Sequence, residues 1–92
     1  MAFPQWPPKD EDEHLDYNID WSPRLSPPDI ISASEWFVPD GLITENEIMT
    51  DNSTTIWLSA GTTGEAYEVL NRVQTMEGRI MDQTVLLKIK VK

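Results

Sequence analysis

The residues that could do chemistry are a single histidine, His14, and the many acidic side chains of the chain. Nucleophilic catalysis needs a serine or cysteine beside an oriented base. The chain has no cysteine, and His14 follows the acidic run 10–13 with no pattern that would orient its imidazole. Two carboxylates could act as acid and base, but spacing distinguishes no pair among the 16 acids. We therefore predict no enzyme and no catalytic residues.

Two motifs share features with binding loops. The Asp-x-Asn-x-Asp spacing at 16–20 begins like a calcium loop, but such a loop needs glycine at its sixth position and glutamate at its twelfth. This chain has Trp21 and Pro27 there. The glycines of 61–64 lack the lysine and the strand–loop–helix order of a phosphate loop. Zinc spacing is absent, and contiguous acids such as 10–13 are typical of solvated charge. We predict no metal and no cofactor.

Composition limits the partners. A length of 92 residues predicts one domain. The net charge of -9 and the pI of about 4.3 disfavour nucleic acid and anionic membranes, because nucleic-acid affinity comes mostly from Lys and Arg. No apolar run reaches the roughly 18 residues of a membrane helix. The N-terminus lacks the basic flank and apolar stretch of a secretion signal, and the absence of cysteine fits a reducing compartment.

Prolines and charges are unevenly distributed along the chain. All seven prolines lie in the first forty residues, and residues 1–68 carry a net charge of -12 while 69–92 carry +3. This polarity suits head-to-tail packing with copies or with a partner, and it predicts an acidic arm and a basic strand that face two different partners. The simpler interpretation is that lysines protect an edge strand from aggregation.

The first 14 residues have the composition of an extended arm. Proline fixes φ and removes a hydrogen-bond donor, so the prolines of this segment, Pro7 and Pro8 among them, oppose both helix and central strand. Phe3 and Trp6 must either fold back on the domain or dock onto a neighbour. Aromatic residues are enriched at interfaces, so the arm is a candidate contact surface; the alternative is a frayed terminus.

The remainder of the chain alternates with the period of β-strands. Apolar residues recur at every second position from Leu15 to Trp21 and from Val85 to Val91. Further strands are predicted at 30–38, 42–49 and 54–59, and the Pro-Asp-Gly sequence at 39–41 predicts a tight turn at which a strand pair folds back.

The segment 64–76 is ambiguous. Its apolar spacing slightly favours a helix, whereas the regular succession of short strands and turns favours a strand that completes the last hairpin. As a strand, it places Tyr67 like the tyrosine corner of an immunoglobulin-type sandwich, and Trp36 becomes a candidate core tryptophan.

These elements predict an all-β fold: an immunoglobulin-like or fibronectin type III-like β-sandwich of about six or seven short strands over residues 15–92, preceded by the Pro-rich arm 1–14. The predicted core residues are Leu15, Tyr17, Ile19, Trp21, Trp36, Tyr67, Val69, Val73, Leu87 and Ile89. The predicted protein-interface residues are Phe3, Trp6, Pro7, Pro8, Trp57, Lys88 and Lys90.

Motifs along nearly the whole chain resemble one family. They are Trp-Pro-Pro-Lys-Asp at 6–10, Leu-Asp-Tyr-x-Ile-Asp-Trp-Ser at 15–22, Ser-x-Trp-x-Val-Pro-x-Gly-Leu at 34–42, the Trp, Gly, Tyr and Asn-Arg-Val positions of 57–73, and Glu-Gly-Arg at 77–79. Together these motifs resemble the fibre–tail adaptors of small tailed phages. The resemblance implies an immunoglobulin-like sandwich that serves as a minor virion component.

The leading functional hypothesis is therefore a non-enzymatic virion adaptor that joins a tail or connector ring to fibres or spikes. Its implied partners are other virion proteins (tail tube, connector or baseplate, and fibre or spike), contacted by several symmetric copies made in the host bacterial cytoplasm. Head–tail completion or capsid decoration is an alternative. A carbohydrate-binding module is a second alternative, because exposed tryptophans such as Trp57 can stack on sugars.

Overall fold

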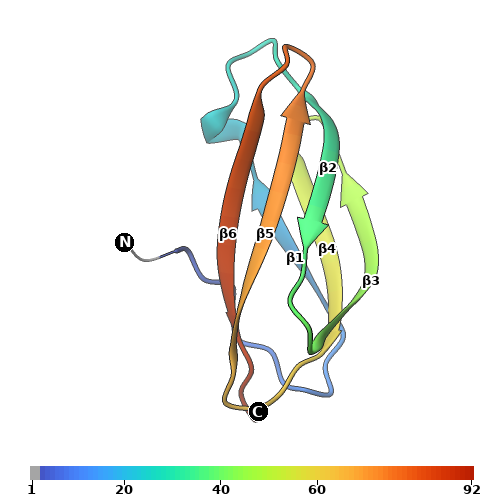
Figure 1. Ribbon diagram of the computed structural model, residues 1–92, viewed down its shortest axis with the longest axis vertical. Coiled ribbons are helices and arrows are strands. Elements are labelled where there is room, and N and C mark those ends of the chain that lie inside the picture. The colour runs from blue at the N-terminus through green and yellow to red at the C-terminus, as the bar shows by residue number, and fades with distance from the viewer. Residues whose placement is uncertain (1–2) are drawn as a thin grey trace.

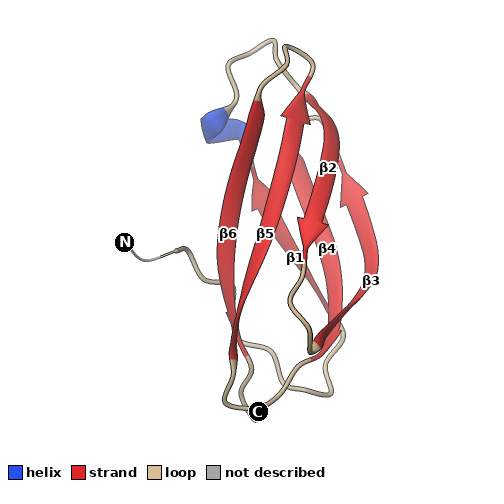
Figure 2. Cartoon of the chain, in the orientation of Figure 1, coloured by secondary structure: helices blue, strands red, loops and turns tan. Residues whose placement is uncertain are grey.

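The computed structural model describes residues 3–92 as a chain built almost wholly of strands, which confirms the predicted all-β class. Met1 and Ala2, the first two residues of the predicted arm, lie outside the described residues. The described elements, coloured by type in Figure 2, are β1 (Leu15–Asp20), the short 3-10 helix η1 (Ser22–Arg24), β2 (Ile31–Phe37), β3 (Leu42–Met49), β4 (Ser53–Ala60), β5 (Ala66–Thr75) and β6 (Ile80–Lys88).

The strands form two three-stranded antiparallel sheets that lie one behind the other in Figure 1. One sheet has the order β1-β4-β3 and the other has the order β2-β5-β6. This order can be laid onto the B-E-D and C-F-G strands of a constant-type immunoglobulin sandwich. β4 and β5 are the two central strands, and the other four strands are edges.

The core lies between the sheets because alternate side chains of each strand point inward. In β5, for example, Val69, Asn71, Val73 and Thr75 are buried, whereas the residues between them are exposed or half-buried. Two apolar clusters result, one of Tyr17, Leu42, Ile56, Leu58, Val69, Leu87 and Ile89, and one of Ile19, Trp21, Ile31, Val73 and Val85. The three predicted core residues outside these clusters are half-buried and pack against them: Leu15, Trp36 and Tyr67.

A buried polar network ties the two sheets together. The Nε1 of Trp21, a fully buried tryptophan, donates to the hydroxyl of Thr54 and to Oδ1 of Asn71, both at 3.1 Å. Thr54 also donates to Asn71 Oδ1 at 2.6 Å, and Asn71 Nδ2 donates to the Ser34 hydroxyl and the Glu35 carbonyl at 2.9 and 3.0 Å. Hydrogen bonding offsets the cost of burying these polar groups and fixes how the sheets are aligned.

The turn at 39–41 does not join a hairpin, so the prediction of a strand pair at this point is wrong. β2 and β3 belong to different sheets. Val38, the residue after β2, packs against the first core cluster. The connection thus crosses from one sheet to the other over the end of the core. The chain enters the second sheet at Leu42, whose side chain is buried in the same cluster.

The segment 64–76 is a strand over most of its length, and the helical alternative is wrong. β5 pairs on one side with β2 and on the other with β6. Its position between two strands decides the conformation, because both of its edges form sheet ladders. The hydroxyl of Tyr67 accepts a hydrogen bond from the Thr62 N–H at 3.0 Å, a few residues upstream, as in a tyrosine corner.

The molecule is elongated, with principal extents of 42 × 29 × 20 Å. The β1–β2 connection, the β3–β4 turn and the β5–β6 turn lie at one end, the upper end in Figure 1. The C-terminus and the β2–β3 and β4–β5 connections lie at the opposite end. Within residues 3–92 there is no helix long and apolar enough to cross a membrane.

Candidate partner-binding surfaces

The N-terminal segment lies along the outer edge of β6. The N–H of Leu86 donates to the Pro4 carbonyl at 2.9 Å, and the N–H of Trp6 donates to the Leu86 carbonyl at 3.0 Å. A second pair of backbone bonds, 3.0 and 2.8 Å long, holds Lys9 against the end of this strand. The described part of the segment therefore folds back on its own domain, which is one of the alternatives that its sequence left open.

The four predicted contact residues of this segment have different environments. Trp6 is half-buried and stacks on Tyr17, with ring centroids 4.8 Å apart. Phe3, with 42% of its surface exposed, and Pro7 face solvent, and Pro8 is half-buried. Trp6 is thus part of the packing between the sheets, whereas Phe3 and Pro7 remain available to a partner.

Lys9 is fully buried and acts as a structural residue. Its Nζ donates to the carbonyls of Asp10 and Ala60 at 2.8 and 2.5 Å. Burial lowers the pKa of Lys9, and nearby carboxylates, that of Glu13 foremost, partly oppose this shift. Lys9 thereby fixes the N-terminal segment to the end of β4.

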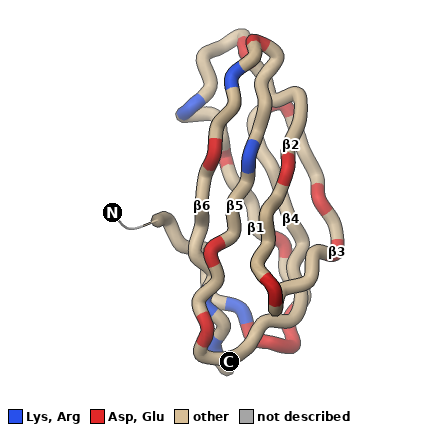
Figure 3. Tube along the Cα trace, in the orientation of Figure 1, with Lys and Arg blue, Asp and Glu red and all other residues tan. Residues whose placement is uncertain are grey.

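The acidic run 10–13 contacts the basic C-terminus, so two regions of opposite charge that lie at the two ends of the chain meet in space. Lys92 donates from its backbone N–H to Asp10 Oδ2 at 3.0 Å, and its Nζ forms an ion pair with Glu13 Oε1 at 2.9 Å. Glu11 accepts from the N–H of Thr63 at 2.9 Å. Hydrogen bonds from backbone N–H groups lower the pKa of each of these three carboxylates. Figure 3 shows acidic and basic positions side by side near the C-terminus.

Lys88 and Lys90 present their side chains to solvent, but their backbone is already paired. The N–H of Ile89, between them, donates to the Glu65 carbonyl, and the Ile89 carbonyl accepts from Gly64, both at 3.0 Å. On the other side, the N–H of Lys90 donates to the Lys9 carbonyl. At Lys88 and Lys90, a partner would therefore contact the exposed side chains rather than the backbone.

Trp57 lies on β4 and is half-buried. The imidazole of His14 stands edge-on to its indole, with ring centroids 5.6 Å apart and an interplanar angle of 88°. A sugar that stacked on Trp57 would compete with His14 for the ring. Trp57 belongs to the sheet of β1, β4 and β3, whereas the other predicted interface residues lie beside or at the end of β6, in the other sheet.

A surface that sequence reasoning missed is the edge strand β3. Every residue of β3 after Leu42 is exposed, including the apolar Ile43, Ile48 and Met49. Ile48, Met49 and Glu47 line a groove between the β3 and β2 edges, together with Ala33 and Ser34 of β2. One sequence signal could have found this surface. The centre of the strand, Thr-Glu-Asn-Glu, is polar at every position, so it lacks the alternating apolar residues of a strand with one buried face.

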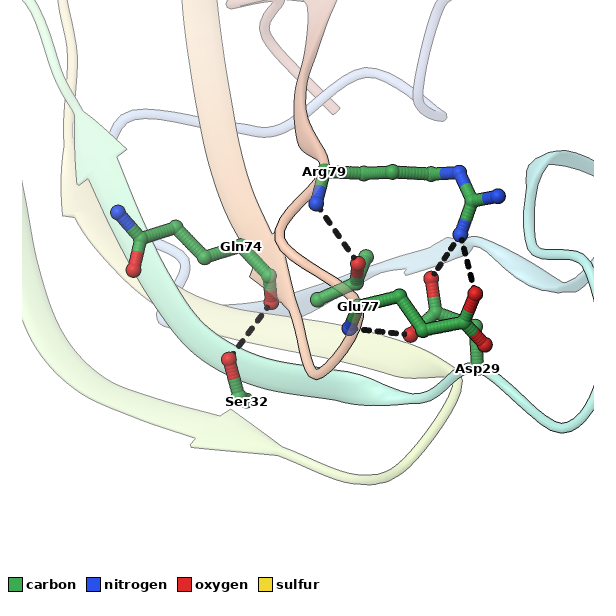
Figure 4. Close-up of polar contacts among 6 residues, drawn as sticks. Asp29, Ser32, Gln74, Glu77 and Arg79 are labelled. Atoms are coloured by element: carbon green, nitrogen blue, oxygen red, sulfur yellow. Dashed lines mark hydrogen bonds and ion pairs between the residues drawn. The ribbon is translucent and has the colours of Figure 1, made fainter.

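A second unpredicted surface is the β5–β6 turn, shown in Figure 4. The carboxylate of Asp29, whose side chain is fully buried, forms an ion pair with Arg79 at 2.7 Å and accepts from the Glu77 N–H at 3.0 Å. Burial acts to raise the pKa of Asp29, but hydrogen bonds from Thr75, Glu77 and Arg79 outweigh it and lower the pKa. These contacts tie the turn to the segment before β2.

Apolar side chains surround this turn. Met76 is 68% exposed and Ile80 is 63% exposed, and the Met76 N–H donates to the carbonyl of Ile30, whose side chain is also exposed. A partner that bound this end of the sandwich would meet these apolar groups on a backbone already held by hydrogen bonds.

The described residues contain little that could do chemistry. In residues 3–92 no three His, Cys, Asp or Glu side chains gather as a metal site. The hydroxyl of Tyr17 is buried without a hydrogen-bond partner, and burial raises the pKa of Tyr17 to about 12. The unpaired hydroxyl therefore stays protonated at neutral pH.

Comparison with known proteins identifies the family. No curated protein matches the sequence. Residues 9–88 match the family described as podophage GP4 fiber-tail adaptor protein gp77, and this range includes all six strands of the two sheets. Since the match covers most of the chain, from the buried Lys9 to the end of β6, the protein belongs to this fiber-tail adaptor family.

Proposed function

We propose that the chain is a non-enzymatic structural adaptor of the phage virion that joins the tail or connector ring to tail fibres or spikes by protein–protein contacts. The observation that carries this proposal is the match of residues 9–88 to a fiber-tail adaptor family. Several symmetric copies occupy one ring of the tail, and each copy contacts the tail on one side and a fibre or spike on the other.

The geometry supports an adaptor because exposed apolar residues lie on separate parts of the molecule. One group, Ile30, Met76 and Ile80, surrounds the β5–β6 turn, and a second follows the β3 edge. A third surface lies beside β6, where Phe3 is exposed. Exposed apolar groups that gather on one part of a soluble domain mark candidate protein-contact sites. We assign the flank beside β6, with Phe3, Pro7, Lys88 and Lys90, to one of the two partners.

The test is particle assembly with and without the chain. We expect particles that lack the chain to carry tails without fibres, as seen by electron microscopy and by the protein content of purified particles. Fibres attached normally in its absence would contradict the proposal. Density for the chain at the head–tail junction or on the capsid would favour completion or decoration instead.

A point variant tests the flank beside β6 without disturbing the packing of Trp6. Phe3→Ala removes an exposed ring from this flank, and Phe37→Ala removes a ring of equal exposure, 42%, from β2. We expect Phe3→Ala to lower incorporation into particles several-fold and Phe37→Ala to leave it unchanged. Equal incorporation of the two variants would remove this flank from the contact surface.

A further inference from the structure

We infer that the β3 edge binds an extended, lysine- or arginine-bearing segment of another virion protein as an added strand. The inference rests on the proposed adaptor function and names the chemistry of one partner. Strand addition to an open sheet edge supplies backbone hydrogen bonds, and alternate side chains supply specificity.

The edges of the two sheets differ in how far they are covered. Residues 4–9 cover the β6 edge by backbone hydrogen bonds. At the β1 edge, Trp6 Nε1 donates to the Asn18 carbonyl at 3.1 Å. The outer edges of β2 and β3 pair with no other strand in residues 3–92. These two edges border the groove that Ile48 and Met49 line, so one side of the sandwich is open to an added strand.

The two ends of β3 carry exposed apolar side chains, and the strand has no lysine. Natural edge strands are commonly protected from unwanted pairing with other chains by charged residues, in particular lysine. β3 has no lysine, and Ile43 and Ile48 are about half exposed, at 54% and 49%, while Met49 is 43% exposed. Exposed apolar residues on an open edge strand provide the contact surface that an added strand would cover.

The charge of this edge selects a basic occupant. β3 carries Glu45 and Glu47, and neither β3 nor its neighbour β4 contains a basic residue. Asp40 and Asp51 lie just beyond the two ends of β3. Opposite charges across neighbouring strands stabilise pairing and like charges oppose it, so a Lys or Arg side chain opposite Glu47 is favoured.

Charge acts against pairing with a second copy through the same edge. Two β3 strands side by side would bring the glutamates of both copies together. A bulge interrupts the register between Thr44 and Asn46, and the Asn46 side chain accepts from the N–H of Glu47 at 2.9 Å, so any added strand pairs with β3 on either side of this bulge. The basic C-terminal segment of another copy is also unsuited to pair with β3, because the backbone around Ile89 is already hydrogen-bonded on both sides within its own chain. The remaining occupant is a segment of a different protein.

The first test uses the full chain and a synthetic peptide of seven alternating lysine and valine residues. A peptide of alternating lysine and proline is the matched control, since it has the same charge but fewer backbone donors. We expect the lysine–valine peptide to slow amide hydrogen exchange in residues 42–49 and the control to leave it unchanged. Glu47→Lys should weaken peptide binding about tenfold, because an attractive cross-strand pair becomes repulsive.

Glu68→Lys is the matched variant, since it makes the same charge change at an exposed position of β5, in the other sheet. We expect it to bind the peptide like the unaltered chain. Three results would overturn the inference: no slowing of exchange in β3, equal slowing by the lysine–proline peptide, or concentration-dependent self-association of the chain through β3, which would make a second copy the occupant.

The particle assay separates this inference from the proposed function. If Glu47→Lys lowers fibre attachment several-fold while Glu68→Lys does not, the β3 edge is the contact. If both variants assemble normally while particles without the chain lack fibres, the inference fails and the adaptor function stands. If particles without the chain carry fibres, the adaptor function itself fails.

Discussion

Asp29 is the residue whose charge fixes one end of the sandwich. It precedes β2 by two positions, and its carboxylate reaches the β5–β6 turn, where Arg79 and the Glu77 N–H bind it. A buried carboxylate is tolerated only when it is paired and hydrogen-bonded. Removing its charge leaves the Arg79 guanidinium without its closest partner.

The depressed pKa of Asp29 gives a prediction about pH. Because the folded-state pKa lies below the ordinary value of 3.8, this group contributes stability above that value, and the contribution is lost as pH falls through the folded-state pKa. We expect Asp29→Asn to be less stable than the unaltered chain at pH 7, and the difference to shrink between about pH 5 and pH 2. Urea unfolding at a series of pH values measures it.

Asp16→Asn, at an exposed position of β1, is the matched control for this titration. We expect its stability to follow the pH dependence of the unaltered chain. If the difference between Asp29→Asn and the unaltered chain stayed constant down to pH 2, the hydrogen bonds of Asp29 would not depend on its charge.

At the scale of elements, the connection between β2 and β3 depends on a close contact with β5. Gly41 has a φ of +105°, a region that favours glycine, and a Cβ at this position would lie 2.9 Å from the Tyr67 hydroxyl. The same hydroxyl accepts from Thr62 and so holds the β4–β5 loop. Gly41 and Tyr67 thus couple two connections at one end of the sandwich.

Two glycine variants separate this contact from backbone strain. Gly78 has a φ of +89°, and a Cβ at this position would meet no heavy atom within 4 Å, so Gly78→Ala costs strain alone, about 1 kcal/mol. Gly41→Ala adds displacement of Tyr67, and we expect it to lower the free energy of unfolding by about 2–3 kcal/mol. Urea denaturation of both variants measures the difference. Equal losses would show that Tyr67 moves aside without cost.

At the scale of the whole molecule, the two central strands and the open edges should differ in local stability. β4 and β5 are each paired on both sides and contribute fully buried side chains, whereas β3 is paired on one side and exposed along most of its length. Local opening needs the least free energy where contacts are fewest. We therefore expect amide hydrogen exchange to be slowest in β4 and β5 and fastest among the strands in β3.

Nuclear magnetic resonance of the free chain measures this order residue by residue. The covered β6 edge provides an internal comparison, because backbone bonds from residues 4–9 protect it. Exchange in β3 as slow as in β4 would mean that the edge is already occupied in solution. That result would also bear on the inferred strand addition.

The sequence determined much of the fold at the level of local pattern. Alternation from Leu15 to Trp21 predicted β1, and the buried residues of β1 are those that the alternation placed inward. Pattern also located β3 and β4 to within a residue or so. These features follow from the period of two of a strand, which depends only on neighbouring residues.

Tertiary structure decided which strands pair and which edges stay open. The turn at 39–41 carries the chain to the other sheet. Lys9 is buried and donates to the Ala60 carbonyl, and the acidic run 10–13 forms an ion pair with Lys92. Each outcome joins segments far apart in the chain, so no local pattern records it. The sequence by itself therefore determined an acidic β-protein with adaptor motifs, and only the packing of its two sheets decided that, within residues 3–92, the edges of β2 and β3 stay open.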